Sequence, residues 1–130
     1  MAVRVGIDLV SVQAVRESLR THEDRYLERV YTAREVTECR TADGIDAERL
    51  AARFAAKEAT LKVLRPRDGG VPWSAIEVLR DPGGWVDLAL TGAAAELAEA
   101  AGVAELAVSL THEGGFASAV VVAELHTYSR

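Results

Sequence analysis

The chain has 130 residues, of which 49% are apolar and 27% are charged, a composition typical of one globular domain with a substantial core. The net charge of -5 argues against general nucleic-acid binding, and the apolar runs are too short to span a membrane. The single cysteine, Cys39, excludes an internal disulfide and a cysteine-based metal cluster, so we expect a reducing, cytoplasmic location.

The first expected element is a strand near the N-terminus. Apolar residues alternate there with Arg4, Gly6 and Asp8, which is the period-two pattern of a half-buried strand. The apolar positions are Val3, Val5, Ile7 and Leu9. Ser11 can cap the helix that follows, which we expect to end at about Arg20.

Arginine is concentrated in the first third of this acidic chain. The residues are Arg16, Arg20, Arg25, Arg29, Arg34 and Arg40. A locally basic surface suits an acidic partner, although arginines scattered over solvated helix faces would give the same composition.

A capping box and a long helix are expected next. Thr32 and Glu35 have capping-box spacing, so a short helix should run to about Arg40. The polar residues 41–47 predict a loop, and a long helix should then extend from about Ala47 to Leu64. Its apolar stripe consists of Leu50, Phe54, Leu61 and Leu64.

Lys57 interrupts that apolar stripe, and Glu58 and Lys62 stand beside it. A core-facing lysine is costly unless it is paired or meets a bound anion. The group therefore suggests a site for a metal ion and phosphates. The simpler alternatives are an ordinary surface pair between Glu58 and Lys62, and a Lys57 ammonium that reaches water along its apolar stem.

The second half of the chain predicts mainly strands. The expected segments are a turn over 66–72, a strand that begins at Ile76, a hairpin turn over 81–84, a strand to Leu90, a helix capped by Thr91 and ended by Gly102, a strand over 106–110, a turn over 113–115 and a strand over 116–125. This order predicts an α+β fold, with a mainly antiparallel sheet packed against a long central helix and shorter helices.

Two motifs together resemble one family. Gly6–Val10 resembles an N-terminal G-x-D motif, and Arg53–Lys62 resembles the central R-F/W-x-x-K-E-A-x-x-K motif of the phosphopantetheinyl transferases. Val108–His112 and the strand after it are similar to the C-terminal hairpin of that family. The length is that of the small holo-acyl-carrier-protein synthase type, and the resemblance covers residues 1–130 as a single domain.

The resemblance implies an activity. Such an enzyme transfers the phosphopantetheine arm of coenzyme A to a serine of an acyl carrier protein, which is acidic, and releases adenosine 3′,5′-bisphosphate. The family uses Mg²⁺, and the small type forms a homotrimer with active sites at subunit interfaces. Neither nucleic acid nor a membrane is an expected partner.

The resemblance also implies roles for particular residues. Asp8 and Glu58 match the metal-binding carboxylates, and Mg²⁺ prefers one or two carboxylates together with phosphate oxygens and water. Asp8, or a metal-bound water held by Glu58, would accept the serine proton, and the sequence does not choose between them. Lys62 would neutralise the departing phosphate.

The remaining candidates would bind the two substrates. Lys57 would contact the pyrophosphate or the pantetheine arm of coenzyme A, and Arg53 and His112 would contact its nucleotide end. The basic surface would dock the acidic carrier protein. The docking candidates are Arg16, Arg20 and Arg25.

The sequence departs from the family pattern at three places, and rival functions stay open. Ala14 replaces a common basic residue, Arg65–Gly70 replaces a glycine-rich turn, and Gly83–Trp85 replaces a common G-K/R-P hairpin. The rivals are a carrier-binding module without turnover, a nucleotide-binding structural oligomer, and a hydrolase that uses the same carboxylates. The sequence does not identify the carrier protein.

Overall fold

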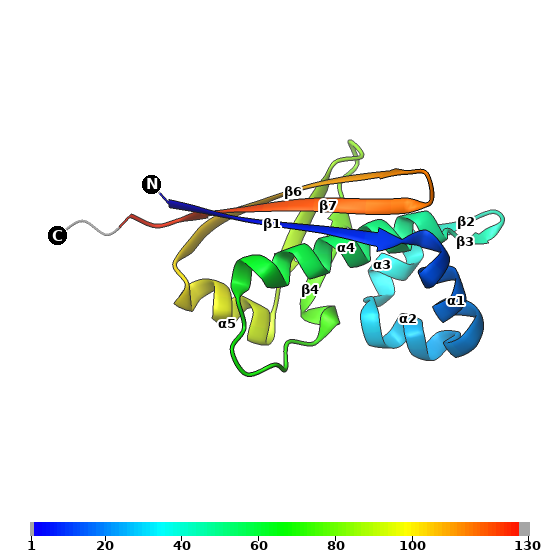
Figure 1. Ribbon diagram of the computed structural model, residues 1–130, viewed down its shortest axis with the longest axis horizontal. Helices are drawn as coiled ribbons and strands as arrows, with labels where there is room; N and C mark the ends of the chain where they lie inside the picture. Colours follow the sequence, from blue (N-terminus) through cyan, green and yellow to red (C-terminus); the bar gives the residue numbers. More distant parts are fainter. Residues whose placement is uncertain (1, 128–130) are drawn as a thin grey trace.

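The structure is a computed structural model that describes residues 2–127 (Figure 1). Its elements, in chain order, are β1 Ala2–Ser11, α1 Val12–His22, α2 Asp24–Val30, α3 Ala33–Glu38, β2 Arg40–Thr41, β3 Gly44–Ile45, α4 Ala47–Leu64, the 3₁₀ turn η1 Trp73–Ala75, β4 Ile76–Arg80, β5 Val86–Leu90, α5 Gly92–Ala100, β6 Val103–Glu113 and β7 Phe116–Leu125. This order confirms the predicted α+β class. No helix within the described range is long and apolar enough to cross a bilayer.

The main sheet has three antiparallel strands in the order β1-β7-β6. Asp8 is paired with Ala119 and His112 with Ala117, so Asp8 and His112 stand on the two opposite edge strands. The pairs β2–β3 and β4–β5 form separate two-stranded sheets. Figure 1 shows α4 along one face of the main sheet, whereas no helix of the described chain covers the other face.

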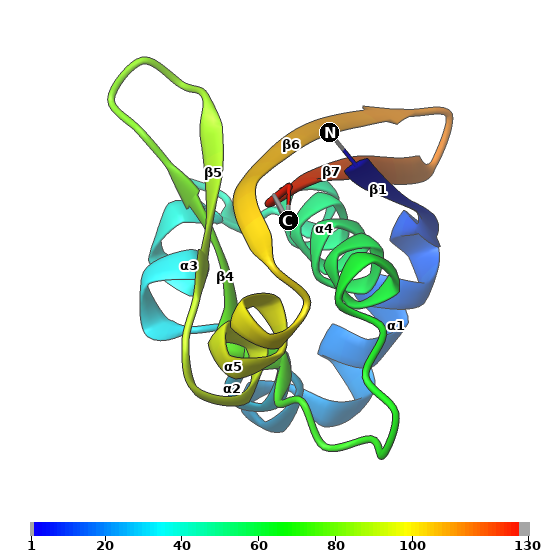
Figure 2. The ribbon, with the colours of Figure 1, turned by 90° about the vertical axis from the view of Figure 1, so that its left-hand side faces the viewer.

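Helix α4 is the centre of the molecule, and its bounds are those the sequence predicts. Asp46 caps its first turn by accepting from the backbone N–H groups of Glu48 and Arg49, and Arg65 ends it in the left-handed conformation. Figure 2 shows α4 enclosed between the main sheet and the surrounding helices. Its sheet-facing alanines, Ala55 and Ala59, are completely buried, and such small side chains let the sheet approach closely.

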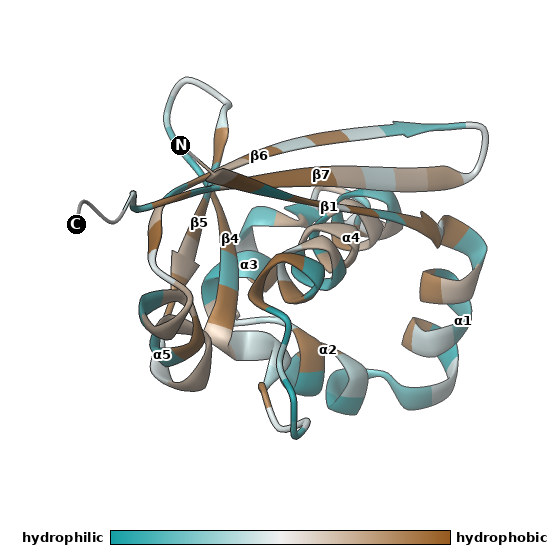
Figure 3. Ribbon diagram, turned by 60° about the vertical axis from the view of Figure 1, so that its left-hand side comes forward, coloured by the Kyte–Doolittle hydropathy of each residue, from teal (hydrophilic) through white to brown (hydrophobic). Residues whose placement is uncertain are grey.

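The alternating apolar residues of β1 do not face the core of this chain. The period-two alternation is correct, but its four apolar residues point away from α4 and are 57–64% exposed. Gly6 is buried against α4, and Asp8 shares its side of the strand. Val5 stands opposite Val122 and Ile7 opposite Val120, so the apolar surface continues onto β7 (Figure 3). The outer face of β1 and β7 is therefore an exposed apolar surface.

Helix α2 and the β2–β3 pair lie where the sequence predicts neither a helix nor strands. Helix α2 follows Glu23, whose φ of 45° breaks the chain direction after α1, and the polar sequence there gives little helical signal. The expected loop over 41–47 holds the two-residue ladder of β2 and β3. Two expected caps are confirmed, because Ser11 accepts from the N–H of Ala14 and Thr32 forms the capping box with Glu35. Thr91 stands at the N-cap of α5, but its side chain makes no cap hydrogen bond.

Candidate functional site

Asp8, Glu58 and Lys62 come together where β1 crosses α4. Lys62 Nζ donates to the backbone oxygen of Ile7 at 2.7 Å and to Asp8 Oδ1 at 3.3 Å. Glu58 lies one turn before Lys62 on α4, so both project from the same side of the helix. The fold thus brings the two predicted carboxylates and the predicted lysine to one place.

Gly6 determines how closely β1 approaches α4. A Cβ atom at this position would lie 2.0 Å from the carbonyl oxygen of Ala59, so a larger residue does not fit. Arg4 supports the same contact, because its Nη1 donates to the backbone oxygen of Val63 at 3.0 Å. Asp8 follows Gly6 on the same face of the strand, and this contact therefore positions its carboxylate beside α4.

The environment of Glu58 favours its neutral form. Partial burial raises the pKa of Glu58, the neighbouring Asp8 carboxylate raises it further, and Lys62 lowers it only in part. The folded protein therefore holds this proton more tightly than the unfolded chain does. As the pH rises through the pKa of Glu58, its ionisation then lowers the free energy of unfolding. A bound divalent cation would relieve the repulsion.

We expect the Glu58 carboxyl to titrate above the ordinary glutamate value of 4.5. Asp8→Asn removes the neighbouring charge and should lower the pKa of Glu58, while Lys62→Met should raise it. Titration of the side-chain carboxyl ¹³C signals by NMR measures these shifts directly, and Glu96 on α5 is a reference carboxyl distant in sequence. If Asp8→Asn left the pKa of Glu58 unchanged, the Asp8 and Glu58 carboxylates could not be as close as described.

A second group of candidates surrounds a cavity of about 520 Å³. The cationic and aromatic side chains in its wall are Arg49, Arg53, Arg80, Trp85 and His112. His112 is half exposed, and its Nδ1 lies 3.0 Å from Glu48 Oε2. Guanidinium and imidazole groups beside an exposed indole suit a ligand that has both phosphates and an aromatic base.

The two groups lie on opposite sides of α4. Lys62 follows Arg53, and Glu58 follows Arg49, by about two and a half helical turns at 3.6 residues per turn, which places them half a turn apart around the axis. Asp8 and His112 are likewise separated across the main sheet by β7. One chain therefore carries two groups of candidate residues that face in different directions, and each group would be one half-site if active sites form between subunits.

Lys57, which was expected to contact coenzyme A, is buried and held by protein oxygens. Its side chain is 0% exposed, and its Nζ donates to Glu35 Oε1 at 2.7 Å and to the backbone oxygens of Trp73 and Ile76. All three N–H donors of the ammonium are thus directed at protein oxygens. Burial lowers the pKa of Lys57, and the Glu35 carboxylate opposes that effect. The core-facing lysine is thus paired within the protein, with Glu35.

Arg53 lines the cavity but is only 1% exposed. Its Nη2 donates to Glu38 Oε1 at 2.8 Å, and its Nε is buried without a hydrogen-bond partner in the described structure. The structure therefore places Arg53 in the cavity wall with its guanidinium held by a protein carboxylate. Its expected contact with the nucleotide end is at most indirect in this arrangement.

The arginines expected to dock the carrier protein are exposed. Arg16 and Arg20 lie one turn apart on α1 and line a groove with residues of the β2–β3 hairpin. Arg25 lines a neighbouring hollow on α2 with Tyr26 and Arg29. None of the three takes part in an ion pair recorded among residues 2–127.

Glu35 and Glu38 hold the Lys57 and Arg53 side chains in place, and the sequence did not single out these contacts. The capping-box spacing identifies Glu35 only as a local partner of Thr32, and Glu38 carries no motif. Their partners on α4 and β4 are distant in sequence, so no local pattern contains that signal.

The family model of the 4′-phosphopantetheinyl transferase superfamily matches residues 4–121. The holo-acyl-carrier-protein synthase of Koribacter versatilis (strain Ellin345) is 39% identical over 126 residues, which cover 95% of this chain and 99% of that protein. The enzyme of the same name from Chloroflexus aurantiacus (strain J-10-fl) is 43% identical, with 91% of this chain and 95% of the relative covered.

Solved structures of similarly named proteins have the same fold. The Chronobacterium ammoniagenes ACPS-CoA complex superposes with a TM-score of 0.85 at 35% identity, and covers 98% of this chain and 100% of that one. The holo-acyl-carrier-protein synthase of Helicobacter pylori, solved in complex with coenzyme A, gives a TM-score of 0.80 at 27% identity, with 93% and 100% covered.

Proposed function

The chain belongs to the 4′-phosphopantetheinyl transferase superfamily, and from this premise we propose that it converts apo acyl carrier protein into the holo form. The observation that carries the proposal is the meeting of Asp8, Glu58 and Lys62 at the contact of β1 and α4. These are the motif residues of a transferase, assembled in a chain that aligns with holo-acyl-carrier-protein synthases over almost its whole length.

The proposed reaction is attack of a carrier serine on coenzyme A. The serine Oγ forms a bond to the phosphorus that bears the pantetheine arm, and the bond from that phosphorus to the bridging oxygen breaks. Adenosine 3′,5′-bisphosphate leaves. The Asp8 carboxylate, or a water held by Glu58, accepts the serine proton. Lys62 is 54% exposed on its side chain, so it can turn from Asp8 to the leaving phosphate.

The donor set at this site fits Mg²⁺. Burial raises the pKa of Glu58, and the nearby Asp8 carboxylate raises it further, so a cation beside both would relieve the repulsion between them. Within the described residues no three His, Cys, Asp or Glu side chains gather around one point, so an ion there would complete its shell with water and phosphate oxygens. When bound, Mg²⁺ would neutralise charge on the pyrophosphate.

We propose that the nucleotide end of coenzyme A binds at the cavity beside His112. His112 is exposed there and can turn from Glu48 to a phosphate, while Arg53 acts from the wall. Because the two half-sites face in different directions on one chain, a complete site is best made by two subunits. The buried free thiol of Cys39 is compatible with the proposed reducing cytoplasm.

We propose a homotrimer that buries the outer face of the main sheet. An apolar surface on β1 and β7 is unfavourable in water and suits a subunit interface. Ile7→Asp should therefore give a monomer that has lost activity, whereas Ala42→Asp in the exposed β2–β3 turn should change neither property. Light scattering coupled to size-exclusion chromatography measures the mass. A trimeric Ile7→Asp variant would rule out this face.

We propose that the exposed arginines of α1 and α2 dock the acidic carrier protein. Arg16→Glu combined with Arg20→Glu should lower kcat/KM for the carrier by about tenfold or more at low salt, because rim charges steer association. The loss should shrink near 1 M salt, where the Debye length is about 3 Å. The KM for coenzyme A is the internal control. A loss independent of salt would point to another docking surface.

Intact-mass analysis tests the proposed function. Apo acyl carrier protein is incubated with this protein, coenzyme A and Mg²⁺, and Glu58→Ala is the matched control. We expect a gain of one phosphopantetheine that requires both metal and Glu58. A folded, oligomeric sample that modifies none of several carriers would contradict the proposal and favour a carrier-binding module without turnover.

A further inference from the structure

Among residues 2–127, no strand other than β5 pairs with β4, so one edge of β4 is without a neighbouring strand. Along this edge, the backbone N–H groups of alternate residues point away from β5 and toward α3 and α4. Exposed edges of this kind normally pair with another strand or are covered by side chains. Here the N–H groups of Val78 and Arg80 both donate to carboxylates of α3.

The first connection is completely buried. Glu35 Oε2 accepts from the N–H of Val78 at 3.0 Å, while its Oε1 accepts from Lys57 Nζ at 2.7 Å. The same ammonium donates to the backbone oxygen of Ile76 on the same strand edge. A single carboxylate–ammonium pair therefore ties α3 and α4 to β4.

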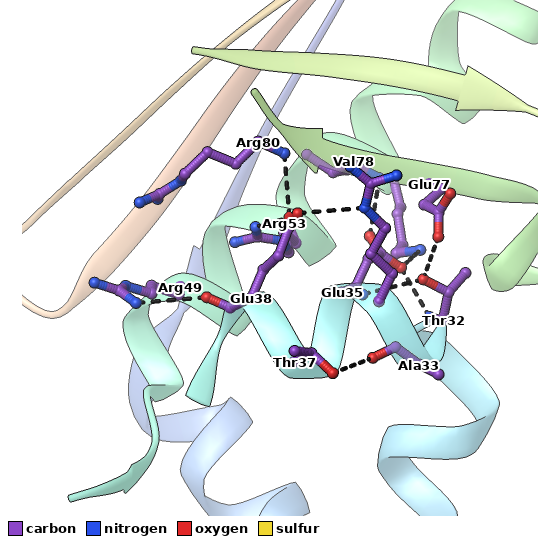
Figure 4. Close-up of polar contacts among 12 residues, drawn as sticks. Thr32, Ala33, Glu35, Thr37, Glu38, Arg49, Arg53, Glu77, Val78 and Arg80 are labelled. Atoms are coloured by element: carbon purple, nitrogen blue, oxygen red, sulfur yellow. Dashed lines mark hydrogen bonds and ion pairs between the residues drawn. The ribbon is translucent and has the colours of Figure 1, made fainter. Parts of the chain in front are cut away.

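The second connection repeats the first one turn further along α3. Glu38 Oε1 accepts from the N–H of Arg80 at 3.1 Å and from Arg53 Nη2 at 2.8 Å (Figure 4). Burial alone would raise the pKa of Glu38, but the hydrogen bonds from Arg53 and Arg80, together with the charges of Arg53 and Arg34, lower that pKa overall. The spacings match, since 35 and 38, 53 and 57, and 78 and 80 are each neighbours on one face of their element.

These two connections lead into the cavity beside His112. Arg80 ends β4, and the hairpin that follows carries Trp85 into the cavity wall. Arg53 stands in the same wall, held by Glu38. We propose that Glu35 and Glu38 are positioning residues that fix the β4–β5 hairpin and Arg53, and so set the shape of the nucleotide half-site. We call Glu35 and Glu38, with their contacts to α4 and β4, the α3 clamp.

The α3 clamp is separate from the contact that positions the reacting groups. Asp8 is placed by the approach of Gly6 to Ala59 and by Lys62, and no clamp residue takes part in these contacts. Loss of the clamp should therefore weaken the binding of coenzyme A and leave the chemical step almost unchanged. This expectation rests on the proposed function, in which the cavity beside His112 binds coenzyme A.

The test weakens the outer connection, where the Glu38 side chain is 19% exposed and truncation is tolerable. Glu38→Ala removes the acceptor, Glu38→Gln keeps one, and Glu99→Ala on α5 is a control for loss of an exposed helical glutamate. Hydrogen exchange of the Arg80 amide, measured by NMR without coenzyme A, reports directly on the hydrogen bond from that amide to Glu38. Steady-state kinetics gives kcat and the KM for coenzyme A.

We expect Glu38→Ala to accelerate exchange of the Arg80 amide and to raise the KM for coenzyme A, each by about tenfold, with kcat within about twofold. Glu38→Gln should bring both the Arg80 exchange rate and the KM for coenzyme A most of the way back to the wild-type values. Glu99→Ala should match the wild type in both. If Glu38→Ala does not fold, Arg53→Lys tests the same connection, because an ammonium does not reproduce the guanidinium geometry, and it should raise the same KM.

Unchanged Arg80 exchange and unchanged KM in the folded variants would overturn the proposal, as would a fall in kcat at constant KM. A wild-type protein that transfers no phosphopantetheine would instead refute the proposed function. The Arg80 exchange measurement would remain interpretable in that case, since it needs neither substrate.

Discussion

Gly6→Ala should destabilise the protein and nearly abolish transfer. The new Cβ atom would lie 2.0 Å from the Ala59 carbonyl oxygen, whereas ordinary contact begins at 3.4 Å. The obstacle is helix backbone, so β1 and α4 must separate. Overpacking of this kind costs about 1–3 kcal/mol, and we expect the upper end. Asp8 would move with β1, and a displacement of about 1 Å can lower a catalytic rate about 100-fold.

Gly83→Ala is the matched control for this substitution. Its Cβ would meet only the side chains of Asp81 and Trp85, at 3.2 and 3.3 Å, and these can move. Urea unfolding gives the change in the free energy of unfolding, and the intact-mass assay gives the rate. Equal stability and activity of Gly6→Ala and the wild type would show that β1 does not approach α4 as described.

Lys57→Met should cost about 3–5 kcal/mol of unfolding free energy. It removes the partner of the buried Glu35 carboxylate, and an uncompensated buried charge is strongly destabilising. It also leaves the backbone oxygens of Trp73 and Ile76 without their donor. Adding Glu35→Gln neutralises the carboxylate, so the double variant should be more stable than the sum of the two single losses predicts, by about 1–3 kcal/mol.

A double-mutant cycle by urea unfolding measures this coupling. Arg49→Met on the same helix is the control, because its pair with Asp46 is partly exposed and should contribute at most about 1 kcal/mol. A loss below about 1 kcal/mol for Lys57→Met would mean that the ammonium is hydrated and not buried.

The part of the candidate site that holds Asp8, Glu58 and Lys62 was anticipated from sequence, because the resemblance of two motifs to one family paired Asp8 with Glu58. Glu58 and Lys62 share a helical face through their spacing, and Asp8 belongs to a short motif that fixes its strand position. The partner of Lys57 was not predictable. The stripe correctly indicates a core-facing lysine that needs a counter-charge, but Glu35 reaches it from another helix, and contact between distant segments leaves no periodic trace.

The sequence could not show which face of β1 meets α4, for a related physical reason. A period of two shows that the strand has two different faces, but it does not say which face meets the core. The rule that apolar residues point inward fails here, because the small Gly6 is needed for close approach to α4, while Ile7 and its neighbours form the outer surface. The caps at Ser11 and Thr32 were predictable because capping is a local hydrogen bond.

The placement of Glu58 and His112 on opposite sides of α4 has a genetic consequence if sites form between subunits. A subunit that lacks Glu58 would still offer its His112 to a neighbour, and a subunit that lacks His112 would still offer its Glu58. Two alleles that are each inactive alone would then complement one another in mixed oligomers. For the same reason, a subunit that lacks both Glu58 and His112 would inactivate the sites that it shares with intact neighbours and behave as a dominant negative.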